Sequence, residues 1–171
     1  VGAEALVRWL HPEYGLVPPG KFIPLFEKNG FITRLDFFVF EEVCRFQRRC
    51  MDAGIKPVPI SVNLTRYDIY QSDFIDILES SRLRYDVPVE LLRIEITETA
   101  VVGDNKQASR VIEQLHKKGY IVEMDDFGSG YSSLNVLKDI ALDVLKLDMR
   151  FLSSDMETSR SGNILSSVVR M

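Results

Sequence analysis

Cysteine and histidine are scarce in this chain of 171 residues, which contains two of each. Cys44 and Cys50 fall in one segment of helical periodicity, where six residues of separation point their side chains to different sides. A disulfide or a zinc-binding cysteine pair is therefore not expected, and the chain fits a reducing, cytoplasmic compartment. His11 and His116 are too few and too scattered for a histidine-based metal site.

Long apolar runs and an excess of basic charge are also missing. No run approaches the ~20 apolar residues of a membrane-spanning helix, and no signal peptide is visible. The net charge of −4 argues against direct DNA binding but leaves room for a small anionic ligand. Because the chain begins with Val1 in a strand-like run, we expect a piece of a longer protein, in which any membrane anchor lies in other segments.

What the chain does have is a regular alternation of strand and helix patterns. Strands are predicted at residues 2–10, 59–65, 91–98, 120–126 and 144–148. Amphipathic helices are predicted around residues 22–29, 35–54, 74–78, 108–118 and 164–169. The apolar, core-facing side of the second helix is predicted to consist of Leu35, Phe38, Val39, Val43 and Phe46. This alternation is typical of parallel βα units, which build either a doubly wound sheet or a (β/α)₈ barrel.

Side-chain parity separates these two folds. Central strands of a doubly wound sheet are apolar on both faces, whereas here each strand has one apolar face and one face with polar groups near its C-terminal end. Burying so many charges without partners costs several kcal/mol each. A TIM-like barrel avoids this cost, because inward residues at its C-terminal mouth converge on a shared hydrated site. We therefore predict the barrel.

Five of the converging residues carry hard oxygen ligands: Glu4, Asn63, Glu95, Asp125 and Asp126. Such a set suits Mg²⁺, Mn²⁺ or Ca²⁺ better than zinc. Adjacent Asp125 and Asp126 are compatible with a strand that ends between them, so that both reach the mouth and serve two metal ions, as in-line attack on a phosphodiester requires. The alternative is that they only cap the following turn.

Three further polar residues have two readings each. Lys146 faces inward, where it orients a nucleophilic water or neutralises a phosphate oxygen, or else forms a structural ion pair with Glu123 or Asp125. Arg8 either holds a substrate phosphate or pairs with a nearby acid. Glu98 either anchors the loop after Phe127 or is solvated.

The motifs that contain these residues resemble the EAL domain, the bacterial phosphodiesterase module for cyclic di-GMP. The chain contains "GAEALVRW", "PPGKFIPLFEKNGFI", "SVNL", "RIEITET", "DDFGSGYSSL" and "LKLD" in the family's order. The resemblance implies a TIM-like barrel that hydrolyses cyclic di-GMP to linear pGpG with Mg²⁺ or Mn²⁺, and in which Ca²⁺ supports binding but inhibits turnover.

Carried over by position, the resemblance also implies roles for single residues. The implied metal ligands are Glu4, Asn63, Glu95, Asp125 and Asp126. Glu4, Asp125 and Lys146 take part in catalysis, and Lys146 lies near the nucleophilic water. Leu6 and Arg8 contact the substrate, and Glu98 steadies the loop after Phe127.

The extent of the chain is the main departure from the family. About five of eight βα units are present, so we expect residues 1–171 to be a partial EAL domain that is weak or inactive in isolation. Expected partners are cyclic di-GMP, a second copy in a homodimer and other domains of a longer protein. The alternatives to an enzyme are a non-catalytic cyclic di-GMP receptor and a signalling or dimerisation module.

Overall fold

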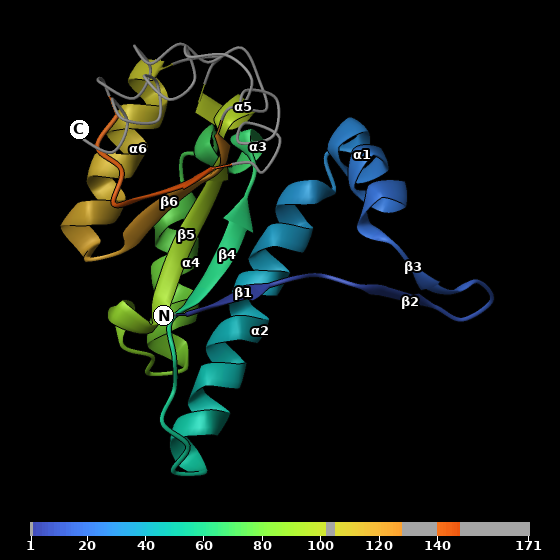
Figure 1. Ribbon diagram of the computed structural model, residues 1–171, viewed down its shortest axis with the longest axis horizontal. Helices are drawn as coiled ribbons and strands as arrows, with labels where there is room; N and C mark the ends of the chain where they lie inside the picture. Colours follow the sequence, from blue (N-terminus) through green and yellow to red (C-terminus); the bar gives the residue numbers. More distant parts are fainter. Residues whose placement is uncertain (1, 102–104, 128–139, 148–171) are drawn as a thin grey trace, which may run out of the picture.

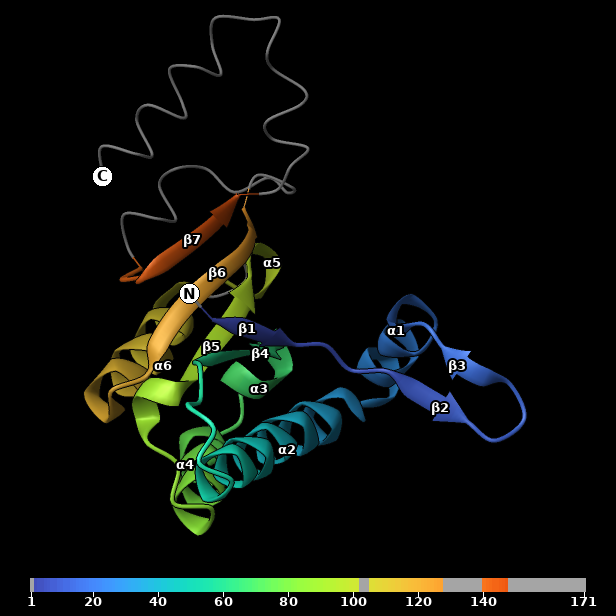
Figure 2. The same cartoon turned by 60° about the horizontal axis from the view of Figure 1, so that its bottom comes forward.

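The computed structural model describes residues 2–101, 105–127 and 140–147. Its centre is a five-stranded parallel sheet in the order β1-β4-β5-β6-β7. The strands are β1 (Ala3–Ala5), β4 (Ile60–Leu64), β5 (Leu92–Thr97), β6 (Ile121–Phe127) and β7 (Val144–Leu147). The sheet curls, and β1 and β7 form its two edges (Figures 1 and 2).

Helices cover one face of this sheet (Figure 1). They are α2 (Ile32–Asp52), α4 (Phe74–Arg84) and α6 (Asn105–Lys118), joined by the short α3 (Arg66–Ile69), η1 (Val89–Leu91) and α5 (Glu98–Val101). The strand residues that face the helices are apolar and buried: Ile60, Val62, Leu64, Leu92, Ile94, Ile96, Val122 and Met124. The other face of the same strands carries the polar side chains, as side-chain alternation requires.

The N-terminal part departs from the predicted single strand over residues 2–10. β1 ends at Ala5, and residues Trp9–His11 form β2, which pairs with β3 (Gly15–Val17) as an antiparallel hairpin. The segment between the predicted strand at residues 2–10 and the predicted helix at residues 22–29 thus contains a strand. The hairpin and α1 (Pro19–Asn29) project away from the sheet (Figure 2). α1 begins with Pro19 and ends at Gly30, whose φ of 76° is the left-handed conformation that glycine adopts without strain.

β1 is held in register at its start by a close backbone approach. The Ala3 N–H donates to the Pro59 carbonyl oxygen at 2.9 Å, and Glu4 pairs with Ser61 across the two strands. A Cβ atom placed on Gly2 would lie 2.9 Å from the same Pro59 oxygen. Only glycine therefore allows this approach.

The apolar face of α2 differs from the prediction. Phe38 and Phe46, which were expected to be buried, are 57% and 48% exposed. The buried face is formed instead by Ile32, Thr33, Asp36, Phe40, Val43, Cys44 and Gln47. Gln47 belongs there because its side-chain amide donates to the carbonyl oxygens of Val58 and Leu91, which close the loops before β4 and β5.

Cys44 and Cys50 are both free thiols. No helix within the described ranges is long and apolar enough to cross a membrane. The helix predicted around residues 164–169 and the loop after Phe127 lie outside the described residues.

The core makes a direct stability prediction on α4, where two leucines differ in burial. Leu78 is fully buried in the core, whereas Leu83 is 63% exposed on the same helix. Leu78→Ala should lower the free energy of unfolding by about 2–5 kcal/mol, through lost burial and a residual cavity. Leu83→Ala is the matched control and should change it by less than about 0.5 kcal/mol. Urea denaturation followed by circular dichroism measures both, and equal losses would contradict this description of the core.

Candidate functional site

The polar face of the sheet carries three of the predicted residues on neighbouring strands, toward the C-terminal ends of those strands. Glu4 on β1 accepts a hydrogen bond from the Asn63 side chain on β4, with 2.8 Å between Asn63 Nδ2 and Glu4 Oε1. Asn63 pairs in register with Glu95 on β5. Glu4, Asn63 and Glu95 lie on three neighbouring strands. Because these strands are parallel, their C-terminal ends meet at the same edge of the sheet.

Glu95 is fully buried. Its Oε1 lies 2.5 Å from Lys146 Nζ, whereas Oε2 has no hydrogen-bond partner within the described residues. Burial raises the pKa of Glu95 to about 6; Lys146 opposes this rise, and the negative charges of Glu4 and Asp125 add to it.

Beside Glu95, on the next strand, a second buried carboxylate has hydrogen-bond partners on both of its oxygens. Glu123 on β6 pairs in register with Glu95 and is 2% exposed. Its oxygens accept hydrogen bonds from Arg93 Nη1 and Ser61 Oγ, both at 2.8 Å, and its Oε2 lies 3.4 Å from Lys146 Nζ. Burial alone would raise its pKa, but the hydrogen bonds from Ser61 and Arg93 and the charge of Lys146 outweigh burial and lower it.

Lys146 therefore bridges two carboxylates. The ion pair with Glu123 that the sequence left open is present, together with a shorter contact to Glu95. Although partial burial disfavours a charged amine, the hydrogen bond and charge of Glu95 and the charge of Glu123 raise the pKa of Lys146.

Asp125 and Asp126 lie where β6 loses its regular pairing. Asp125 still pairs in register with Thr97, whereas the register shifts between Met124 and Phe127. Asp126 is exposed and has a φ of 56°, a left-handed conformation that aspartate tolerates better than most residues. The strand thus changes direction at the second acid, which is how both carboxylates can reach the same rim.

Glu98 begins α5, directly after β5, and is 2% exposed. The solvated alternative is therefore wrong. The loop that it was predicted to anchor, after Phe127, lies outside the described residues, so that role stays a prediction.

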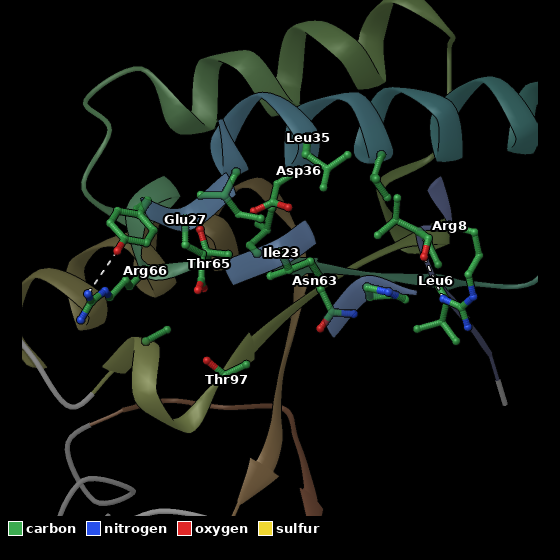
Figure 3. A pocket seen from close by; sticks show the side chains of 18 residues that line it. Leu6, Arg8, Ile23, Glu27, Leu35, Asp36, Asn63, Thr65, Arg66 and Thr97 are labelled. Atoms are coloured by element: carbon green, nitrogen blue, oxygen red, sulfur yellow. Dashed lines mark hydrogen bonds between the residues drawn. The ribbon is translucent and has the colours of Figure 1, made fainter. Parts of the chain in front are cut away.

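A pocket of about 460 Å³ opens beside these residues (Figure 3). It lies where β1, β4 and β5 end, under α1 and α2, and its lining includes Asn63 and Thr97. Leu6 and Arg8, the predicted substrate contacts, also line it; Leu6 is 59% exposed, and Arg8 Nη1 donates to the Val7 carbonyl oxygen at 2.8 Å. The remaining wall is largely apolar, with Pro19, Ile23, Ile32, Leu35, Val39, Leu64 and Ala100.

The sequence reading missed the acid in this pocket. Asp36 points from α2 into it (Figure 3), is 8% exposed, and has an Oδ2 atom without a hydrogen-bond partner in the described part of the chain. Burial and the neighbouring Asp68 carboxyl raise the pKa of Asp36 to about 9. Asp68 itself is held by the Thr65 backbone N–H at 2.7 Å and the Thr65 hydroxyl at 2.9 Å, as the capping box of α3. The only signal in the sequence is an acid on the buried face of α2.

The donor chemistry at the rim fits a divalent cation. Glu4, Asn63, Glu95, Asp125 and Asp126 offer oxygen ligands only, and Glu95 Oε2 is a buried acceptor without a donor among the described residues. Within the same residues, no three acidic, cysteine or histidine side chains are already gathered as a metal cluster. The residues thus have the right donor chemistry, and Glu4 and Asn63 are in direct contact through a hydrogen bond; the shared metal site stays a prediction.

Comparison with known protein families identifies the family of this chain. The family model described as EAL domain matches residues 1–171, which is the whole chain. The chain belongs to the EAL family. The resemblance drawn from the sequence motifs is therefore confirmed.

Relatives of this EAL domain include two proteins of Pseudomonas aeruginosa. The bifunctional diguanylate cyclase/cyclic di-GMP phosphodiesterase MucR is 36% identical over 171 residues, which are 100% of this chain and 25% of MucR. The cyclic di-GMP phosphodiesterase NbdA is 34% identical over 168 residues, or 98% of this chain and 22% of NbdA. The chain thus spans about a quarter of the length of these relatives.

A solved structure supports the same fold. The MucR phosphodiesterase in its c-di-GMP complex matches with a TM-score of 0.84 and 36% identity, over 98% of this chain and 68% of that one. The α/β fold class of a TIM-like barrel is confirmed, and the five described strands form part of such a barrel.

The buried acid of this EAL domain makes stability depend on pH. Because the pKa of Asp36 is raised above its unfolded value of 3.8, the folded state holds a proton that the unfolded state releases. Stability from this group is therefore complete below about pH 4 and declines toward pH 9, by an amount on the order of 1 kcal/mol per pH unit. Asp36→Asn should flatten this decline in urea denaturation between pH 5 and pH 9. The control is Asp52→Asn at the exposed end of α2; curves of equal slope for the unaltered chain and both variants would contradict the proton held by Asp36 in the folded state.

Proposed function

We propose that this EAL domain is the catalytic domain of a cyclic di-GMP phosphodiesterase that hydrolyses its substrate to linear pGpG with a divalent metal ion, Mg²⁺ or Mn²⁺. The observation that carries the proposal is the buried Glu95, with one oxygen unpartnered in the described part of the chain, beside the joined Glu4 and Asn63 at the C-terminal rim of a parallel sheet. In TIM-like barrels this rim is the site of catalysis. The MucR and NbdA relatives are both phosphodiesterases of cyclic di-GMP by name.

The five oxygen-bearing residues at the rim are the proposed ligands: Glu4, Asn63, Glu95, Asp125 and Asp126. A divalent cation held there would activate a water molecule and stabilise charge on the phosphate oxygens. Lys146 is placed to hold that water or a phosphate oxygen, since its ammonium group lies against Glu95. Arg8, at the mouth of the pocket, offers a planar fork of donors to a phosphate.

The pocket beside the rim suits one base of the substrate. A volume of about 460 Å³ is large enough for a nucleobase, and the apolar wall favours a flat ring. Asp36 places a carboxyl group in this pocket with one oxygen, Oδ2, that is unpartnered within the described ranges, and an N–H group of a guanine edge can donate to it. Leu6, exposed at the rim, would contact the same base.

Binding and turnover test the proposal separately on the 171-residue chain. Calorimetry with cyclic di-GMP in Ca²⁺ should show metal-dependent binding, because Ca²⁺ satisfies the same oxygen ligands without supporting turnover. Chromatography for pGpG in Mn²⁺ should show turnover far below an ordinary kcat of about 1–10³ s⁻¹, because the sheet formed by the described strands is open between β1 and β7. Absence of binding in either metal would contradict the proposal. Binding in both metals without any product would indicate a receptor instead.

Glu4→Gln tests the metal ligands directly. The change keeps the side chain's shape at an exposed position, so the fold should persist, while one negative charge and one metal ligand are lost. We expect the Ca²⁺-dependent part of the cyclic di-GMP affinity to fall roughly 10- to 100-fold. Glu13→Gln, on the exposed hairpin, is the matched control and should bind as the unaltered chain does. Equal affinities for Glu4→Gln and the control would remove Glu4 from the site.

A further inference from the structure

Lys146 presents a charge problem once a cation is placed at Glu95. Its Nζ is 2.5 Å from Glu95 Oε1, and its side chain is only 33% exposed. A divalent cation that binds Glu95 through Oε2, which is unpartnered among the residues that the structure describes, draws on the same negative charge that neutralises the ammonium group at Oε1, and it repels that group at the same time. A half-buried ammonium without a counter-charge is costly, so the site needs a second carboxylate that does not bind the metal.

Glu123 meets this requirement. It lies one strand away from Glu95 in the same register, and its Oε2 is 3.4 Å from Lys146 Nζ. Its other contacts come from below the rim: Arg93 donates to Oε1 and Ser61 donates to Oε2, each at 2.8 Å. With both oxygens engaged and 2% of the residue exposed, Glu123 cannot turn toward the rim without breaking these bonds.

The geometry points to Glu123 as the positioning residue of this site. It is the fixed counter-charge that keeps the Lys146 ammonium group in place when Glu95 binds the metal ion. The inference rests on the proposed function, because it assumes that Glu95 binds a divalent cation. Glu123 does not touch the metal or the substrate. It lets Glu95 give its charge to a cation without leaving Lys146 without a counter-charge, and it fixes the place from which Lys146 reaches the water or the phosphate.

Metal binding without substrate tests this role, with Mn²⁺ as the probe and electron paramagnetic resonance as the measure of free ion. In Glu123→Gln, Lys146 has only Glu95 as its carboxylate partner and competes with the metal for it. We expect Mn²⁺ affinity to fall roughly 10-fold or more. The matched control is Glu42→Gln, which removes one negative charge from a surface ion pair with Arg45 on α2. It should leave Mn²⁺ affinity unchanged.

A double-mutant cycle with Lys146→Met separates this role from a merely structural one. If Glu123 acts through Lys146, then Lys146→Met and Lys146→Met/Glu123→Gln should bind Mn²⁺ within about twofold of each other. An equal loss on Glu123→Gln in both backgrounds, or no loss in either, would overturn the inference.

Two further outcomes are defined. Glu123→Gln could be found unfolded by circular dichroism, because Arg93 has lost its partner. In that case Glu123→Asp is used instead, which keeps the negative charge but withdraws it from Lys146 by one methylene group. Unchanged Mn²⁺ affinity of Glu123→Asp would overturn the inference. If the unaltered chain binds Mn²⁺ and follows the cycle but does not bind cyclic di-GMP, the inference stands and the proposed function fails. A chain that binds no Mn²⁺ contradicts both.

Discussion

The contact between Lys146 and two buried carboxylates is the interaction on which the rest of this site depends. Parallel pairing places Glu95 and Glu123 side by side on β5 and β6, where two negative charges in a dry environment repel each other. Lys146 reaches both from β7, and Arg93 adds a second positive charge from below. Without these cations the polar face could not be buried, and the strands could not hold acids at their ends.

This network also explains why one face of the sheet can be an apolar core while the opposite face carries ion pairs. Ile94 and Val122 pack against helices on the covered face, and their strand neighbours Arg93 and Glu123 form an ion pair on the opposite face. Each strand thus contributes to stability with one set of side chains and to the site with the next. A substitution that slips the register by one residue would exchange the two faces.

The alternation of strand residues was enough to predict the central sheet, because it depends only on which faces are buried. It also placed Glu4, Asn63 and Glu95 on the polar face, where Glu4 and Asn63 are in contact and Glu95 pairs in register with Asn63. The hairpin of β2 and β3 was missed, because Gly15, which begins β3 with a φ of 64°, interrupts the pattern of apolar residues that would indicate a second strand. The buried face of α2 was wrong for Phe38 and Phe46, since aromatic residues suggest a core-facing stripe even where Gln47 and Asp36 occupy it. Asp36 could not be predicted as a site residue, because it lines the pocket together with residues of β4 and α1. This is a tertiary arrangement that no local sequence pattern reveals.

The close approach of Gly2 to the Pro59 carbonyl has a consequence for how variation in this chain should be read. β1 is three residues long, and the residue before it has no room for a methyl group. A side chain at this position would push the edge strand outward and carry Glu4, Leu6 and Arg8 with it. In an assay of metal or nucleotide binding, Gly2→Ala would therefore have the same effect as the loss of the proposed metal ligand Glu4, although the added methyl group lies against the Pro59 oxygen and not at the proposed site. A substitution at Gly2 therefore acts by displacing β1 and not by removing a functional group.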